Sequence, residues 1–234
     1  MSTSTTTVFN SVAPCAPRPF QVKDAPRSEP GLGKSSCGVD LRLGRTAAAF
    51  RAFLESFYLD LTDPNLAGTD RRVARAYGEL LAGLNPGAEP GLSTFPNTDG
   101  YEGIVSVTGI SFYSICAHHF LPFFGTAHVG YVPGERLLGL SKVARVVEYY
   151  ARRPQLQERM TAQIAAFLDE RVGPAGVMVS VEARHLCMEM RGVSRPGVIT
   201  KTTAARGVMK KSRLQREFLK GLRDATVQGP TGGD

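Results

Sequence analysis

The sequence contains few cysteines, only four in 234 residues. That number is too small for a disulfide framework in a chain of this length, so we expect reduced thiols. The chain also lacks any stretch of about 18 consecutive apolar residues, which excludes a membrane-spanning helix. Its N-terminus, MSTSTTTVFNSVAP, has neither the basic nor the apolar region of a signal peptide. We therefore expect a soluble, cytoplasmic protein with no membrane partner.

Two kinds of sequence pattern are absent as well. No segment repeats at a period of roughly 20 to 50 residues, which excludes solenoids and propellers. There is no glycine-rich phosphate loop of the Walker or dinucleotide-binding type. What is present is a hydrophobic content of 42%, enough for one large domain with a sizeable core.

Acidic residues are outnumbered by basic ones, 21 against 28, which gives a formal net charge of +7. Such an excess favours an anionic partner. Residues 191–223 hold ten Lys or Arg and a single acid, Glu217. A solvated basic face explains this run as well as anion binding does. Because no aromatic stacking platform accompanies the basic residues, we do not expect nucleic-acid binding.

Composition divides the chain into three parts. Residues 1–44 are rich in Ser, Thr, Pro and Gly and show no helical or strand period, so we expect a disordered N-terminal extension. Residues 45–224 carry the periodic patterns of a folded catalytic domain. Residues 225–234 are expected to form a flexible tail.

Apolar spacing predicts four helices before residue 173. The first begins near Thr46 and fades by Leu61, and the second follows Asp70 as its N-cap. Ser141 is the expected cap of the third, and the fourth lies between residues 154 and 172.

Alternating patterns predict strands between these helices. Residues 103–115 and 125–133 form an expected hairpin with a bend at Gly109, and residues 177–183 and 198–203 form a further pair. A short helix around residues 214–222 ends the pattern. The predicted class is α+β, an antiparallel sheet covered on one face by helices.

The segment SICAHHFLPFF, residues 114–124, carries the main chemical signal. Cys116 and His119 are three residues apart, a spacing that lets a thiolate and an imidazole hold one Zn²⁺ from a turn. Cys187, far downstream, would make a third ligand and leave the fourth tetrahedral position open, as in catalytic zinc sites. His118 and His185 then remain as candidate acid–base groups beside the metal.

Simpler interpretations of these residues stay open at this point. A buried free cysteine is commonly a small hydrophobic side chain, and adjacent histidines are often ordinary core or surface residues. A non-catalytic zinc protein that binds RNA or DNA is a further alternative. It would need a closed site, and the sequence has no fourth Cys or His at ligand spacing.

Three blocks in order resemble GTP cyclohydrolase I. Weaker similarity lies in residues 70–84 and 216–219, and the whole likeness runs from about residue 46 to residue 223. The three blocks are CAHHFLPFFGTAHVGYVP (116–133), GLSKVARVVEYYARRPQLQER (139–159) and VEARHLCMEMRGV (181–193).

The resemblance implies a tunnelling fold whose subunits join their sheets into a ring barrel. The expected assembly is a homodecamer of two stacked pentamers, with sites between subunits. The implied activity is zinc-dependent hydrolysis of the imidazole ring of GTP, releasing formate and giving 7,8-dihydroneopterin triphosphate. That product belongs to pterin chemistry, including tetrahydrofolate biosynthesis and one-carbon metabolism.

The resemblance also implies residue roles. Cys116, His119 and Cys187 correspond to the zinc ligands, and His118 and His185 to the catalytic histidines. Glu158, with a carboxylate that matches N1–H and the 2-amino group of guanine, would read the purine together with Gln157; helical geometry alone favours a solvated Glu158. The resemblance further implies that the triphosphate and ribose are contacted by Ser141, Lys142, Arg145, Arg191 and Arg72. Ser141 is also an implied catalytic helper. For each of these contacts, surface ion pairing is the alternative interpretation.

One position departs from the family pattern. The family usually has Glu between the Cys and the first His of this motif, and here the residue is Ala117. Neither a ligand nor a catalytic histidine is lost, but a carboxylate in or beside the pocket is. An alternative hypothesis is therefore a diverged paralogue that acts on a related purine nucleotide or stops at a ring-opened formamidopyrimidine.

Overall fold

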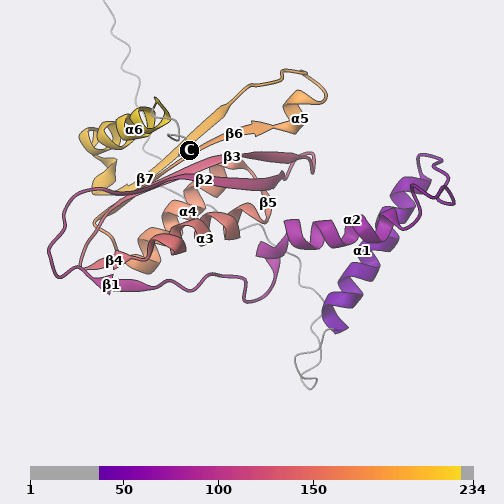
Figure 1. Ribbon diagram of the computed structural model, residues 1–234, viewed down its shortest axis with the longest axis horizontal. Coiled ribbons are helices and arrows are strands. Elements are labelled where there is room, and N and C mark those ends of the chain that lie inside the picture. The colour runs from indigo at the N-terminus through magenta and orange to yellow at the C-terminus, as the bar shows by residue number, and fades with distance from the viewer. Residues whose placement is uncertain (1–36, 228–234) are drawn as a thin grey trace, which may run out of the picture.

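The computed structural model describes residues 37–227, with side chains described for residues 42–223. Most of the expected N-terminal extension and residues 228–234 of the expected tail lie outside the described residues. The described part is α+β, as predicted (Figure 1).

A five-stranded sheet forms the centre of the fold, with the strand order β5-β2-β3-β6-β7. The three central strands pair antiparallel over most of their length, and β7 continues this pattern. The strands are β2 (Val105–Cys116), β3 (Pro122–Val132), β5 (Pro154–Gln155), β6 (Gly176–His185) and β7 (Thr200–Gly207).

The long β2–β3 hairpin contains the expected bend. Its register shifts between Val107 and Ile110, and Gly109 between them has φ 74°, a conformation that glycine adopts without steric cost. The hairpin turn covers residues 117–119, and the apolar residues that begin β3 follow it.

The prediction of a purely antiparallel sheet is wrong at one edge. The two-residue strand β5 pairs parallel to β2, with Cys116 opposite Gln155. Helix α3 ends at Ala151, and Pro154, which cannot continue a helix, begins β5 beside the end of β2. A separate two-stranded sheet joins β1 (Thr94–Pro96) to β4 (Arg136–Leu138).

Two helices cover one face of the sheet, α3 (Leu140–Ala151) and α4 (Gln157–Val172). Their apolar stripes bury Val143 and Val147 of α3 and Ile164 of α4 against inward-facing residues of β2, β3 and β6 such as Val129. This packing is the main core. It follows the periodicity that predicted the helices.

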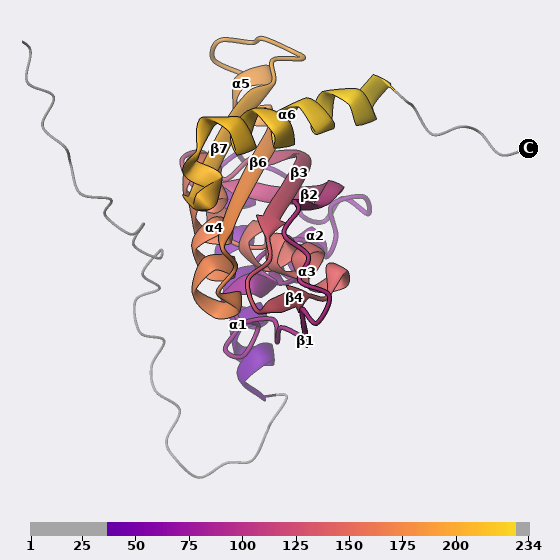
Figure 2. The same cartoon turned by 90° about the vertical axis from the view of Figure 1, so that its left-hand side faces the viewer.

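The other face is not bare, so the expectation that helices cover only one face is wrong. Helix α6 (Ser212–Val227) follows a short turn η2 (Val208–Lys210) and runs across the strands on the side away from α3 and α4 (Figures 1 and 2). Phe218 is buried against Gly130 and Met178. A Cβ at Gly130 would lie 2.6 Å from the Phe218 ring, so glycine there makes room for the helix.

The first two helices form an arm that projects beyond the end of the sheet (Figure 1). The arm consists of α1 (Cys37–Glu55) and α2 (Thr69–Leu80), and a short turn η1 (Ala82–Leu84) joins it to the rest. Helix α1 begins before the expected Thr46. The reason is that Arg42 donates to Asn85 Oδ1 at 2.8 Å and Leu43 lies over Gly78, so the earlier turns have partners.

Two predicted helix caps are also wrong. The N-cap of α2 is Gly68 and that of α3 is Gly139, so Asp70 and Ser141 lie in the first turn instead. Asp70 is buried and accepts from Arg51 Nε at 3.0 Å, which ties α2 to α1. Over residues 37–227, none of the helices combines the length and the hydropathy needed to cross a bilayer.

Candidate metal centre and active site

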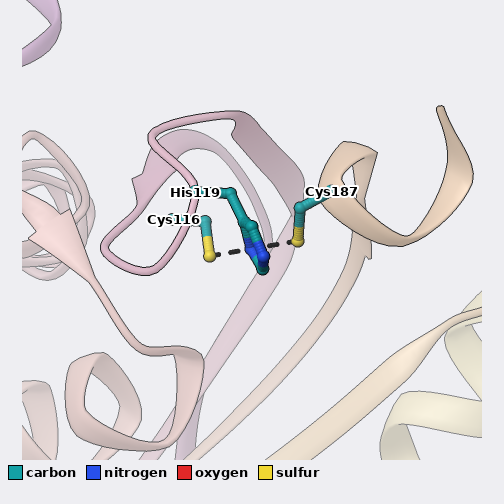
Figure 3. A group of neighbouring side chains, drawn as sticks. All are labelled: Cys116, His119 and Cys187. Atoms are coloured by element: carbon teal, nitrogen blue, oxygen red, sulfur yellow. Dashed lines mark hydrogen bonds between the residues drawn. The ribbon is translucent and has the colours of Figure 1, made fainter. Parts of the chain in front are cut away.

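Three potential metal ligands converge at one end of the sheet. Cys116 ends β2, His119 lies in the following turn, and Cys187 lies in the short helix α5 (Leu186–Glu189) directly after β6. Their ligand atoms all lie within 4.8 Å of one another. Figure 3 shows the three side chains pointing toward a common point.

The spacing fits a tetrahedral metal ion. The two sulfurs are 3.9 Å apart, and two thiolates on a tetrahedral Zn²⁺ with bonds of about 2.3 Å would be roughly 3.8 Å apart. Two sulfurs and one imidazole are also a donor set that suits zinc. This Cys-His-Cys group can therefore hold a metal ion.

Strand pairing explains how Cys187 reaches the other two ligands. Phe123, at the start of β3, pairs with His185, at the end of β6. This register places the beginning of α5 beside the β2–β3 turn. The ligands are distant in sequence, so the sheet must form before all three can meet.

Aromatic stacking holds the turn that carries His119. Phe120 has φ 56°, a left-handed conformation that is rare for a residue with a large side chain. Its ring stacks on Tyr77 of α2 at 5.7 Å between centroids, and the Tyr77 hydroxyl donates to the Phe120 carbonyl at 3.4 Å. The arm thus supports the backbone conformation next to a metal ligand.

The pKa of the Cys187 thiol depends on its surroundings. Burial raises the pKa of the Cys187 thiol, and the neighbouring Cys116 raises it further, while Arg191 opposes both effects. Two adjacent thiolates without a cation repel each other. A metal ion between them reverses this balance because it stabilises the deprotonated forms.

His185 is held on two sides. Its ring is stacked on the buried ring of Phe123 at 4.7 Å, with an angle of 3° between the planes. Its Nε2 lies 2.8 Å from Oε1 of Gln157. Burial lowers the pKa of His185, and the nearby carboxylate of Glu158 partly offsets that effect.

His118 differs from His185 in its surroundings. It is exposed in the β2–β3 turn, with its ring 6.2 Å from that of His119. Ala117 joins the end of β2 to these two histidines. Its backbone is held in place because the Ala117 N–H donates to the Gln155 carbonyl at 2.9 Å. The Ala117 side chain adds no polar group there.

Gln157 and Glu158 start α4, and their side chains have different environments. Gln157 is 2% exposed and makes four hydrogen bonds within the chain. Glu158 is exposed and close enough to His185 to affect its pKa. Arg191, also exposed, lies near Cys187. Gln157 and Glu158 therefore lie beside His185, and Arg191 lies beside the metal group.

The other predicted contacts are not brought to this end of the sheet. The start of α3, with Ser141 and Lys142, follows Leu138, whose N–H donates to the Tyr131 hydroxyl. Tyr131 lies nine residues along β3 from Pro122, a distance of roughly 30 Å along a strand. Arg145 is exposed on the next turn of α3.

Arg72 is likewise separate from the metal group within one chain. Its guanidinium donates to the Ala67 carbonyl at 2.9 Å and to Thr69 Oγ1 at 2.6 Å, at the start of α2. In the arrangement described, Arg72 stabilises the turn between α1 and α2.

Sequence reasoning missed the residues that support the site. Phe123 and Thr202, whose hydroxyl lies 3.1 Å from the Gln157 amide nitrogen, carry no chemical signature, and Tyr77 lies in a helix far from the motif. Strand register could have suggested Phe123, because it stands opposite His185. No pattern in the sequence indicates that Tyr77 stacks on Phe120.

Fold and site together define a class: an α+β protein with a three-ligand metal group next to a firmly held histidine. The sequence model described as GTP cyclohydrolase I matches residues 46–223. The chain belongs to the GTP cyclohydrolase I family, which confirms the resemblance.

Individual relatives agree with this assignment. The chain is 47% identical over 175 residues to GTP cyclohydrolase 1 of Streptococcus pyogenes serotype M49 (strain NZ131), covering 74% of this chain and 89% of that protein. It is 49% identical over 169 residues to GTP cyclohydrolase 1 of Geobacillus sp. (strain WCH70), covering 72% and 89%. Among solved structures, the archaeosine synthase QueF-Like in the apo form matches at 20% identity with a TM-score of 0.38, over 44% of this chain and 93% of that chain.

Proposed function

We propose that this chain hydrolyses the imidazole ring of the guanine of GTP, in a zinc-dependent reaction that releases formate and gives 7,8-dihydroneopterin triphosphate. The observation that carries the proposal is the convergence of Cys116, His119 and Cys187 beside His185 and Glu158, in a member of this family. Residues 45–224 would form the catalytic domain.

Cys116, His119 and Cys187 are the proposed zinc ligands. Three protein ligands leave a tetrahedral ion one position for a water or substrate group. Zinc bound there supplies a Lewis acid and lowers the pKa of a water molecule toward about 7.

Two histidines carry the proposed proton transfers. One of them protonates a purine ring nitrogen when the C8–N bond breaks, and the other assists opening of the ribose, with Ser141 positioned to help the rearrangement. We assign His118 to the first step and His185 to the second. Imidazole suits both steps because its ordinary pKa lies near neutral pH.

Glu158 is the proposed guanine-reading residue. Its exposed carboxylate can accept from N1–H and the 2-amino group together, a pattern that adenine does not offer. Gln157, the other residue expected to read guanine, has its amide engaged within the chain, so the selection of guanine is left to Glu158.

We propose that neighbouring chains complete the site in a homodecamer of two stacked pentamers. Ser141 and Lys142 begin α3 at the far end of the sheet from the metal group of their own chain, and Arg145 lies on the next turn of that helix. A ring places that end of one chain against the metal end of the next, where the cations and the start of α3 would bind the triphosphate. Arg191 and Arg72 are the further proposed phosphate contacts.

The proposed setting is the cytoplasm. Two of the three ligands are thiols, and a reducing compartment keeps them available for a metal ion. The product would enter pterin chemistry such as tetrahydrofolate biosynthesis.

The direct test is incubation of zinc-loaded protein with GTP, with products identified by fluorescence, mass spectrometry and a formate assay. We expect one formate per dihydroneopterin triphosphate. The variants His118→Ala and His185→Ala should keep their zinc and lose turnover by about 10²–10⁴-fold. Absence of turnover of any purine nucleotide by the zinc-loaded wild type would contradict the proposal.

Ala117 supports a second candidate, a diverged enzyme that acts on a related purine nucleotide or stops at a ring-opened formamidopyrimidine. The methyl group places no carboxylate between the ligand Cys116 and His118. Under this hypothesis, mass spectrometry of the wild-type reaction would find a ring-opened end product, and Ala117→Glu would restore the pterin. Dihydroneopterin triphosphate from the wild type excludes a ring-opened end point.

A further inference from the structure

One end of the Gln157 side-chain amide faces groups that accept hydrogen bonds. Its Nε2 donates to the carbonyls of Val181 and Thr200, at 3.1 and 3.0 Å, and lies 3.1 Å from Thr202 Oγ1. A backbone carbonyl has no proton to give. The end of the amide that faces the two carbonyls must therefore be the NH₂ group, which fixes the orientation of Gln157.

A pair of threonines supports the same orientation. Thr161 Oγ1 donates its one proton to the backbone carbonyl of Gln157 at 2.8 Å. The 2.7 Å contact between Thr161 and Thr202 must then use the proton of Thr202. Thr202 is left as an acceptor toward Gln157, so it too requires the NH₂ group on that side.

The opposite end of the amide faces His185. Oε1 of Gln157 is 2.8 Å from His185 Nε2, and an amide oxygen only accepts. His185 Nε2 must carry a hydrogen in this contact. The stack on Phe123 fixes the plane of the ring, so the hydrogen bond and the stack together determine both its position and its rotation.

We propose that Gln157 is a positioning residue that holds His185 as the Nε2–H tautomer and reserves Nδ1 for the reaction. Neutral His185 then carries its hydrogen at Nε2 and its lone pair at Nδ1, the nitrogen that Gln157 does not occupy. The role in turnover rests on the proposed function, whereas the tautomer does not. Gln157 in this role does not read guanine.

The start of α4 then has two separate tasks. Gln157 points inward to the histidine, and Glu158 points outward, where it can meet the purine. Consecutive helix residues lie about 100° apart around the axis, so one turn can serve both sides. The geometry thereby couples the position of the purine to that of the proton-transferring ring.

The test begins with the tautomer itself. Zinc-loaded full-length protein labelled with ¹⁵N-histidine has four imidazoles to assign, and His185→Ala identifies the signals of interest. At a pH of about 8.5, where an ordinary imidazole is neutral, we expect a protonated Nε2 and an unprotonated Nδ1 for His185. In Gln157→Met we expect a mixture of the two tautomers. A wild-type His185 protonated at Nδ1 would overturn the proposal.

Kinetics with GTP separates positioning from guanine recognition. Gln157→Met should keep its zinc and its KM for GTP within about twofold, and lose at least about tenfold in kcat, because the ring is no longer held for proton transfer. If Gln157 reads guanine instead, KM for GTP should rise strongly, the preference for GTP over ITP should fall, and the His185 tautomer should not change. That result would contradict the inference.

A matched variant controls for the loss of a buried amide. Gln163 is a second buried glutamine on α4, and its Oε1 accepts from Gln155, whereas His185 Nε2 pairs with Gln157. Gln163→Met should leave both the tautomer and kcat unchanged. Equal effects of Gln157→Met and Gln163→Met would assign Gln157 a purely structural role. If the wild type does not turn over GTP, the proposed function fails and the kinetic test no longer applies. The NMR result then decides the tautomer of His185 by itself.

Discussion

Cys187 completes the metal group from a different part of the chain than Cys116 and His119. We expect Cys187→Ser to lose most of its bound zinc, because a serine hydroxyl is a poor zinc ligand at neutral pH and two ligands remain. Metal analysis of purified protein measures this directly. Cys15→Ser, which removes a thiol that is not among the proposed ligands, is the control and should retain one zinc per chain. Full zinc content in Cys187→Ser would show that the ligand assignment is wrong.

Glu158 illustrates how one carboxylate can set substrate choice. We expect Glu158→Gln to weaken kcat/KM for GTP by at least roughly 2 kcal/mol, since purine donors would lose a charged acceptor. That loss corresponds to about 30-fold or more. Glu170→Gln, an exposed acid near the other end of α4, should have no effect. Steady-state kinetics with GTP compares the two variants, and an unchanged Glu158→Gln would exclude Glu158 as the guanine-reading residue.

At the scale of elements, helix α2 acts on the metal group through the contact between Tyr77 and Phe120. Stacked aromatic pairs contribute about 0.5–1.5 kcal/mol. We expect Tyr77→Leu to weaken zinc affinity by up to about tenfold, because the turn that carries His119 loses its support. Competition with a chelator measures the affinity. Tyr77→Phe keeps the stack and loses only a 3.4 Å hydrogen bond, so its affinity should stay near that of the wild type. Equal zinc affinity in the wild type, Tyr77→Leu and Tyr77→Phe would show that the Tyr77 ring does not support the metal group.

The ion pair between Arg51 and Asp70 makes the stability of the arm depend on pH. A hydrogen bond from the Arg71 N–H lowers the pKa of Asp70, and Arg51 lowers it further. The pKa of Asp70 is therefore lower in the folded protein than in the unfolded chain. The ionised carboxylate stabilises the folded arm at pH values above the unfolded pKa of about 3.9, and this stabilisation is lost as the pH falls through the folded pKa.

Hydrogen exchange of the α1 amides tests this dependence. At a pH of about 6, Asp70→Asn should show less protection in α1 than the wild type, and the difference should shrink near pH 3.5. Asp99→Asn, an exposed acid elsewhere, should match the wild type at both values. A difference between Asp70→Asn and the wild type that does not change with pH would show that the carboxylate charge plays no part.

The elements that sequence predicted well are those with local signals. The spacing of Val143 and Val147 predicted α3, and the alternation of residues 177–183 predicted β6, because burial on one face imposes a period. The caps failed because glycine at 68 and 139 leaves no side-chain signal. The start of α1 failed because its first turns depend on contacts with Asn85 and Gly78, which are distant in sequence.

The candidate site was predictable to a similar extent. Cys116, His119 and Cys187 were found by spacing and by donor chemistry, which a sequence displays directly. The hydrogen bond between Gln157 and His185 was not found, because it depends on the orientation of a buried amide. That orientation is set by carbonyls of Val181 and Thr200, which no residue type reveals.

At the scale of the whole molecule, the separation between the metal group and the start of α3 predicts that active sites form between chains. We expect the native particle to contain ten chains of 25.2 kDa, measurable by mass photometry. A particle consisting of a single chain would contradict the assembly.

Subunit mixing tests the shared site directly. Cys187→Ser and Arg145→Ala should each be nearly inactive alone. Co-expressed in equal amounts, they should recover about a quarter of wild-type activity, since random neighbours pair an intact metal end with an intact α3 in that fraction of sites. Two copies of Cys187→Ser carrying different tags provide the control and should remain inactive. No recovery in the mixed particles would place the whole site within one chain.

The ligand set also has a consequence for how the protein is handled. His119 and Cys187 meet only after β3 has paired with β6, so a chain with an incomplete sheet lacks the complete ligand set. The zinc content of a preparation therefore counts the chains whose central sheet is complete. A sub-stoichiometric value after expression would report incomplete folding as well as metal shortage, and adding zinc to the purified protein distinguishes the two. Only correctly folded empty chains should take up the ion at once.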